Sequence, residues 1–256
     1  MFEIMLAGLF IMAASLSGIL FTTTYASNFL HNKLDALVSF SAGVFIVTAA
    51  SLILEVFHIT ESIIQTFSLV ALGYVAAALL HIALPETHHH HDNECSEKRG
   101  ARKILAGDAI HNIADGIILV PAFIVSGGLG MAVALSIFIH EFLQEISEFF
   151  ILKSAGYSTR RALVTNFLIS STIFIGIGIG YFALASERLE SFLLAVSGGF
   201  FLHVVIHDLL PKKAHDHQTR GANIGMVLIG ILLMFSVNLL LADSHTHEDD
   251  RSEEVH

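Results

Sequence analysis

The chain has 256 residues, of which 54% are hydrophobic and 14% charged, a balance that excludes an ordinary soluble globular domain. Its formal net charge of −10 argues against nucleic acid as a partner and modestly favours attraction of cations. A single cysteine, Cys95, rules out an internal disulfide bond.

Eight apolar runs are long enough to cross about 30 Å of hydrocarbon as helices. Because they are continuously apolar instead of alternating, we expect an all-α polytopic membrane protein and not a barrel. We interpret the first run as a retained span, since its only early charge is the acidic Glu3. The expected spans of this single membrane domain, residues 1–256, are approximately 4–24, 36–57, 63–84, 103–125, 129–152, 161–184, 189–210 and 222–242.

The basic residues predict the orientation of these spans. Of the 13 Lys and Arg, all but Arg188 and Arg251 fall on one face, which is therefore expected to be cytoplasmic. Eight spans then place both termini outside the cytoplasm, together with an acidic, histidine-containing tail at 243–256.

The longest connection, 85–102, contains the run His88, His89, His90 and His91 and is expected in the cytoplasm. It has two compatible interpretations, a solvated loop or a weak metal-collecting segment. Glycines at 126–130 predict a tight hairpin, whereas those at 176–180 and 197–199 are typical of closely packed membrane helices.

Two neighbouring spans each carry one polar stripe. In the span 103–125, the stripe consists of Asp108, His111, Asn112 and Asp115 at helical spacing. In the span 129–152, it consists of Glu141, Glu145 and Glu148, with His140 and Gln144 on the adjacent row. If the hairpin turns near Gly128, His111 should lie level with Glu145, Asn112 with Gln144, Asp115 with Glu141, and Asp108 with Glu148.

An isolated charge near the middle of a membrane helix costs roughly 2.5–3.5 kcal/mol or more. A cluster of several charged side chains there therefore requires compensating positive charge. A bound divalent cation or protons would supply the missing positive charge. Mixed nitrogen and oxygen ligands suit zinc, iron(II), manganese or cadmium. The structural alternative is a polar zipper between two helices.

Other polar positions have weaker interpretations. Glu55 shares a helix face with Thr48 and Ser51 and is a candidate ligand or outer-mouth residue, whereas Asn166 and Ser170 suggest helix packing. A third set lies toward the cytoplasmic end of the span 189–210 and consists of His203, His207 and Asp208. It is explained equally well by a metal-release site and by polar side chains at the membrane–water interface.

The stretches HNIADG (111–116) and HEFLQE (140–145) together resemble the paired signatures of the ZIP (Zrt/Irt-like) metal transporters. The resemblance extends to AGVF at 42–45, GYSTRRALVTN at 156–166 and GGFFLHVVIHDLLP at 198–211. It implies a ZIP-like helix bundle that moves zinc into the cytoplasm by alternating access, with Fe²⁺, Mn²⁺ and Cd²⁺ as alternative cargo. Dimers are common in the family, and four of its spans are thought to move against the rest.

Carried over by position, the resemblance implies a one- or two-metal site. His111, Asp115, His140 and Gln144 match positions around the first metal, and Asn112, Glu141 and Glu145 match second-metal or neighbouring positions. Leu143 replaces a proline, Gln144 stands where His or Glu is frequent, and the second span lacks the usual ligand apart from Glu55. Asp108, Glu148, His203, His207 and Asp208 remain accessory candidates.

The strongest competing function is an intramembrane zinc protease, because HEFLQ resembles the HExxH helix of such enzymes. Gln144 argues against it, since the second histidine is missing. A di-iron oxidase would need Glu-x-x-His pairs, and a metal sensor would need an output domain. We therefore expect a transporter and not an enzyme, embedded in the lipid bilayer of a cell membrane (inner or plasma), of prokaryotic type.

Overall fold

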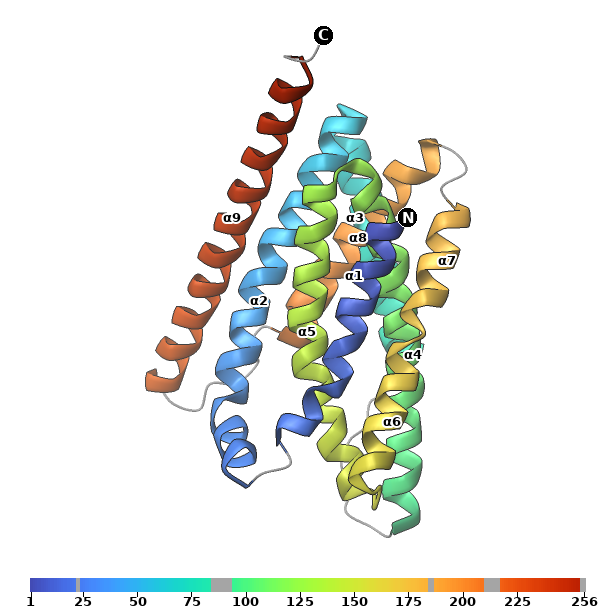
Figure 1. Cartoon of the computed structure of the whole chain (residues 1–256), viewed down its shortest axis with the longest axis vertical. Coiled ribbons are helices and arrows are strands. Elements are labelled where there is room, and N and C mark those ends of the chain that lie inside the picture. Colours follow the sequence, from blue (N-terminus) through green and yellow to red (C-terminus); the bar gives the residue numbers. More distant parts are fainter. Residues whose placement is uncertain (22–23, 84–93, 184–186, 210–216, 254–256) are drawn as a thin grey trace.

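The computed structural model describes residues 1–21, 24–83, 94–183, 187–209 and 217–253 (Figure 1). These parts are almost entirely helical, which confirms the all-α prediction. The elements are α1 (Phe2–Met12), η1 (a 3-10 helix, Ala13–Phe21), α2 (Thr24–Thr60), α3 (Ile63–Ala83), α4 (Glu94–Val125), α5 (Gly127–Ser154), α6 (Thr159–Ser170), α7 (Ile173–Ala183), α8 (Glu187–Val204), η2 (a π-helix, Val205–Leu209) and α9 (His217–Glu253).

The helices correspond to the eight expected spans, with differences at their ends and in their continuity. Six segments of the described chain are long and apolar enough to cross a membrane, and two shorter apolar helices, Ile63–Leu79 and Phe192–His207, coincide with the remaining expected spans. α2 and α4 begin well before the expected span starts at 36 and 103, because hydropathy marks where a helix enters the bilayer and not where the helix begins.

Two expected spans are not single α-helices. The first changes at Ala13 from an α-helix to a 3-10 helix, and the sixth is interrupted between Ser170 and Ile173. Hydroxyl residues lie at both breaks, Ser15 and Ser17 in the first span and Ser171 and Thr172 in the sixth. Hydropathy could not predict the breaks from them, because a serine such as Ser68 also lies within the unbroken helix α3.

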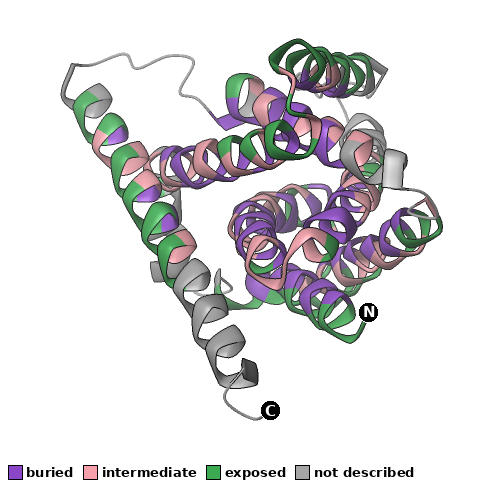
Figure 2. Ribbon diagram, turned by 90° about the horizontal axis from the view of Figure 1, so that it is seen from above, coloured by how far each residue is buried: buried purple, intermediate pink, exposed green. Residues whose placement is uncertain are grey.

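The helices pack in two sets. In one set, α2 packs against α9, α8 and α3, and α3 packs against α8. The other set consists of α1, η1, α4, α5, α6 and α7, with α4 packed mainly against α7 and α5. The sets meet mainly where α5 contacts α2 and α9, and where α4 contacts α8. Viewed from above, buried residues face the interior of the bundle and exposed ones its outer surface (Figure 2). That outer surface is strongly apolar, as at Phe182 and Ile64, which suits contact with lipid.

Glycine pairs bring the paired helices of each set close together. A Cβ built on Gly116 of α4 would overlap the carbonyl oxygen of Ile173, and one on Gly176 of α7 would overlap that of Ile113. Equivalent pairs are Gly43 with Gly230 between α2 and α9, and Gly73 with Gly199 between α3 and α8. The packing role expected for 176–180 and 197–199 is thus confirmed at Gly176 and Gly199.

The hairpin between α4 and α5 is tighter than expected. α4 ends at Val125, and Ser126 caps α5, which already begins at Gly127. The Ser126 hydroxyl accepts a hydrogen bond of 3.0 Å from the Leu129 N–H. The turn is therefore centred on Ser126 and not on Gly128, which changes the relative height of the two polar stripes.

Replacing Ser126 with alanine should remove this cap and lower stability by about 1 kcal/mol, a typical cost for an N-cap. The thermal midpoint of the detergent-solubilised chain measures the effect. Ser154→Ala is the control, since that exposed hydroxyl bonds only within its own helix, to the Ile151 carbonyl. Equal midpoints for both variants would contradict a capping role.

Candidate metal site

α4 presents its polar stripe to the interior of the bundle. Asp108 and Asp115 are buried, Asn112 is fully buried, and the His111 side chain keeps about a fifth of its surface exposed. Their spacing places them along one face of the helix, as the sequence predicts. The polar stripe of α4 is therefore largely buried within the helix bundle.

α5 likewise buries most of its polar residues. His140, Glu141, Glu145 and Glu148 all lie among the buried residues. Gln144 is partly buried between the two helices. Such carboxylates are rarely buried unless they are paired or bind a cation.

The two stripes face each other, but in a register shifted from the expected one. His111 Nε2 lies 3.5 Å from Glu141 Oε1, instead of opposite Glu145. Gln144 donates to Asp108 Oδ1 at 2.7 Å, instead of lying against Asn112. The reason is the earlier hairpin turn at Ser126, which moves residues of α5 by about one turn relative to α4.

The first candidate ligand set, here called the histidine group, consists of His111, His140 and Glu141. Each residue offers a ligand atom, and these atoms lie within 4.8 Å of one another. Asp115 Oδ2 is 3.8 Å from His111 Nε2 and borders the group. Imidazole nitrogens and a carboxylate oxygen in this arrangement are typical zinc ligands.

The second set, here called the carboxylate group, consists of Asp108, Glu145 and Glu148. Their ligand atoms also lie within 4.8 Å of one another. The group therefore includes Asp108 and Glu148, which were only accessory candidates in the sequence. It lies about one helical turn nearer to the beginning of α4 than the histidine group.

Many buried atoms of these two groups and of their polar neighbours lack a hydrogen-bond partner in the described part of the chain. They are Asp108 Oδ2, His111 Nε2, Asn112 Oδ1, Asp115 Oδ2, both Glu141 carboxylate oxygens, Glu145 Oε2, Glu148 Oε2 and Asn166 Oδ1. Leaving a buried polar atom unpaired costs roughly 1–3 kcal/mol, and more for a charged one. So many unpartnered atoms in one place are compatible with a site for a cation.

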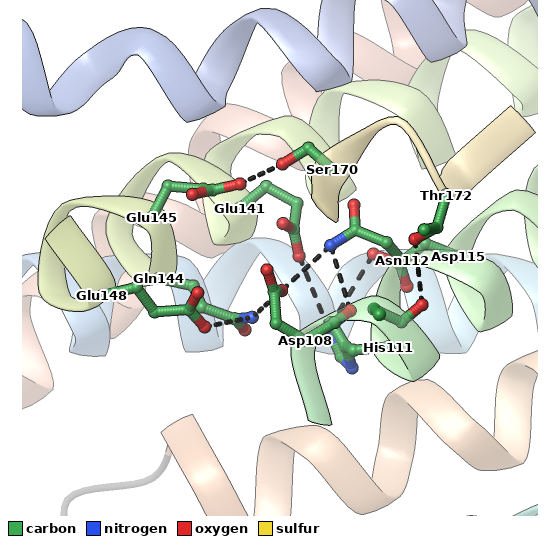
Figure 3. Close-up of polar contacts among 11 residues, drawn as sticks. Asp108, His111, Asn112, Asp115, Glu141, Gln144, Glu145, Glu148, Ser170 and Thr172 are labelled. Carbon is green, nitrogen blue, oxygen red and sulfur yellow. Dashed lines mark hydrogen bonds and ion pairs between the residues drawn. The ribbon is translucent and has the colours of Figure 1, made fainter. Parts of the chain in front are cut away.

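α6 contributes residues that the sequence had suggested only for helix packing. Ser170, its last residue, donates a hydrogen bond to Glu145 Oε1 (Figure 3). Asn166 donates to the Glu145 carbonyl at 3.2 Å. Thr172, in the break before α7, donates to the Ala109 carbonyl at 3.0 Å. The interruption of the sixth span thus lies beside the site, where half-helix ends are suited to binding ions.

The remaining candidates lie apart from these two groups. The imidazole rings of His203 and His207 stack with centroids 4.4 Å apart, and Tyr74 hydroxyl lies 3.1 Å from His207 Nε2. Glu55 is partly buried on α2 and is in neither ligand set. Residues His88–His91 and the side chain of Asp208 lie outside the described part.

Comparison with known proteins decides the family. A family model described as ZIP zinc transporter matches residues 81–238, which include α4, α5 and α6 completely. The chain belongs to the ZIP zinc transporter family. Family membership agrees with the signatures at 111–116 and 140–145 and with the expectation of a transporter instead of an enzyme.

Curated relatives support the same family over this central part. Human zinc transporter ZIP4 is 36% identical over 148 residues, covering 57% of this chain and 22% of that protein. Mouse zinc transporter ZIP10 is 32% identical over 149 residues, covering 54% of this chain and 18% of that protein. Bovine metal cation symporter ZIP14 is 32% identical over 144 residues, covering 54% of this chain and 29% of that protein.

The matches span less than a third of the length of these relatives. All three are animal proteins, so they give no support to a prokaryotic source. A ZIP protein is a membrane protein, in agreement with the six membrane-length helices of the described chain.

The family also disfavours the protease alternative, and the geometry around HEFLQ agrees. Gln144 occupies the place of the second zinc-binding histidine of such an enzyme. Its amide nitrogen is directed toward Asp108 Oδ1 and Glu148 Oε1, at 2.7 and 3.3 Å. An uncharged amide engaged with two carboxylates is a poor substitute for a zinc-binding imidazole.

Proposed function

We propose that this ZIP family chain moves a divalent transition metal, with zinc as the first candidate, across a cell membrane into the cytoplasm. The transported ion would bind between α4 and α5. The observation that carries the proposal is the histidine group, in which two imidazoles and a carboxylate come together within the membrane-spanning part of the molecule.

The histidine group suits a cargo site because its ligands are chemically mixed. Nitrogen and oxygen ligands favour zinc and neighbouring transition metals over magnesium or calcium. No thiolate is needed, and the single Cys95 lies far along α4 from His111. Zinc sites rich in thiolates are mostly structural, whereas a transport site must release its ion. Fe²⁺, Mn²⁺ and Cd²⁺ remain alternative cargo.

The surroundings of the histidine group suit a dehydrated ion. The Phe45 and Phe200 rings lie 5.1 Å from His140 and 6.1 Å from His111, measured between ring centroids. Phe200 belongs to α8 and Phe45 to α2, so the helix set that contains α2 and α8 closes over ligands held by the set that contains α4 and α5. A relative movement of the two sets would open or cover the site, as alternating access requires.

Uptake by purified protein in liposomes tests this function. Vesicles containing the wild-type chain should accumulate zinc down an imposed gradient, measured with a fluorescent zinc indicator inside the vesicles. Protein-free vesicles and calcium in place of zinc serve as controls. Equal zinc entry with and without the protein would overturn the proposal.

A further inference from the structure

The carboxylate group has a pattern of hydrogen bonds that a polar helix contact does not require. Each carboxylate uses one oxygen to accept a hydrogen bond from a neighbour and leaves its other oxygen without a partner among the described residues. We propose that Asp108, Glu145 and Glu148 form a separate, oxygen-only site for a divalent cation. In this site Gln144 is a positioning residue and not a ligand.

The burial of the three carboxylates is the first argument. Their relative exposures are 3% for Asp108, 0% for Glu145 and 5% for Glu148. Their unpartnered oxygens are Asp108 Oδ2, Glu145 Oε2 and Glu148 Oε2. Three buried carboxylates with one vacant oxygen each can surround a cation without breaking any hydrogen bond that they already make.

Gln144 holds two of these carboxylates in place. Its Nε2 donates to Asp108 Oδ1 at 2.7 Å and to Glu148 Oε1 at 3.3 Å (Figure 3). The opposite amide orientation would place its oxygen against two carboxylate oxygens, so the donating orientation is favoured. An amide nitrogen has no lone pair to offer a metal, so the Gln144 atom that contacts the two carboxylates orients them from outside the cation's coordination sphere.

Two further donors complete the support. Asn112 Nδ2 donates to Asp108 Oδ1 at 2.9 Å, and the Ser170 hydroxyl bonds Glu145 Oε1. Ser170 is the last residue of α6, and the C-terminal end of a helix favours a nearby positive charge. Donors from α4, α5 and α6 all favour ionised carboxylates, whose combined negative charge a divalent cation would offset.

The ligand chemistry separates this site from the histidine group. Oxygen-only sets suit hard cations such as Mn²⁺, Mg²⁺ or Ca²⁺, whereas the imidazoles beside Glu141 suit zinc. The carboxylate group can bind a cation whether or not the chain transports zinc. Only the idea that this cation lies beside a transported metal rests on the proposed function.

The test measures Mn²⁺ binding by the full-length chain in detergent, using electron paramagnetic resonance to count bound ions. The substitutions His111→Asn and His140→Asn first remove the imidazoles of the histidine group. This background should still bind Mn²⁺. Adding Glu148→Gln, which is isosteric, should weaken binding by at least about tenfold, and Glu145→Gln is the alternative if that variant does not fold. Glu3→Gln, an exposed carboxylate of α1, is the matched control.

Gln144→Ala tests the positioning role in the same background. Loss of an outer-shell partner should weaken Mn²⁺ affinity by roughly 10–100-fold while the number of bound ions is unchanged. The zero-field splitting should also change, because the carboxylates reorient around the ion. Gln65→Ala, an exposed glutamine of α3, should alter neither property. Zinc binding by Gln144→Ala with both histidines intact should remain, which separates positioning from general damage.

Absence of Mn²⁺ binding in the imidazole-free background would overturn the proposal. Binding that Glu148→Gln and Glu145→Gln leave unchanged would also overturn it. Hyperfine coupling between bound Mn²⁺ and the Gln144 nitrogen would show that Gln144 is a ligand and not a positioning residue. Vesicle uptake plays no part in these measurements, so failure of transport and failure of this site give different results.

Discussion

Replacing His111 with alanine is expected to abolish zinc uptake by the chain in liposomes. His111 is central to the histidine group, since its Nε2 lies 3.5 Å from Glu141 Oε1 and 3.8 Å from Asp115 Oδ2. Without it, the buried carboxylates Glu141 and Asp115 would keep only the His140 imidazole as a nitrogen ligand in the group. Uptake should fall by more than the roughly 10–100-fold that loss of an outer-shell partner costs.

The matched control for this variant is His58→Ala. His58 is an exposed histidine in the last turn of α2, outside both ligand groups. It should take up zinc at the wild-type rate. Full uptake by His111→Ala, with protein amount equal in both sets of vesicles, would exclude the histidine group as the cargo site.

Replacing Gly176 with leucine is expected to have the largest effect on stability. Its Cβ would overlap the Ile113 carbonyl oxygen, and backbone atoms of a packed helix cannot move aside as a flexible side chain can. α4 and α7 would have to separate, which removes the contacts that hold α4 within its helix set. We expect a loss of several kcal/mol, beyond the 1–3 kcal/mol typical of overpacked cores.

Gly178→Leu is a control in the same helix, two residues away. Nothing lies within 4 Å of a Cβ built on Gly178, so a side chain there extends into open space. The thermal midpoint and the fraction of monodisperse protein in gel filtration measure both variants. Similar midpoints for the two leucine variants would show that close approach at Gly176 is not important for stability.

The sequence predicted the ligand types but not which of them meet. Helical spacing was enough to place His111 and Asp108 on one face of α4, because that periodicity is a local property of the chain. The partner across the hairpin depended on a turn that could be centred on Ser126 or on Gly128. Moving the centre of the turn from Gly128 to Ser126 shifts α5 by about one helical turn relative to α4. As a result, Glu141 and not Glu145 lies opposite His111.

The role of Gln144 could not be predicted from the chain either. Its position in HEFLQE resembles a ligand position of the family, and that resemblance implied a place near the first metal. In the structure its amide instead faces Asp108 and Glu148. Which neighbour an amide faces depends on the rotation of both helices, and no pattern along one helix contains that information.

The amino-acid sequence by itself determined the all-helical membrane architecture, the family, and the two polar stripes. These properties depend on composition and on periodicity within single helices. Tertiary structure decided the register of α4 against α5, the separation of the ligands into two groups, and the participation of Ser170 through the break after α6. The physical reason is that each of these depends on contacts between helices, where backbone approach and caps such as Ser126 set heights that local sequence does not encode.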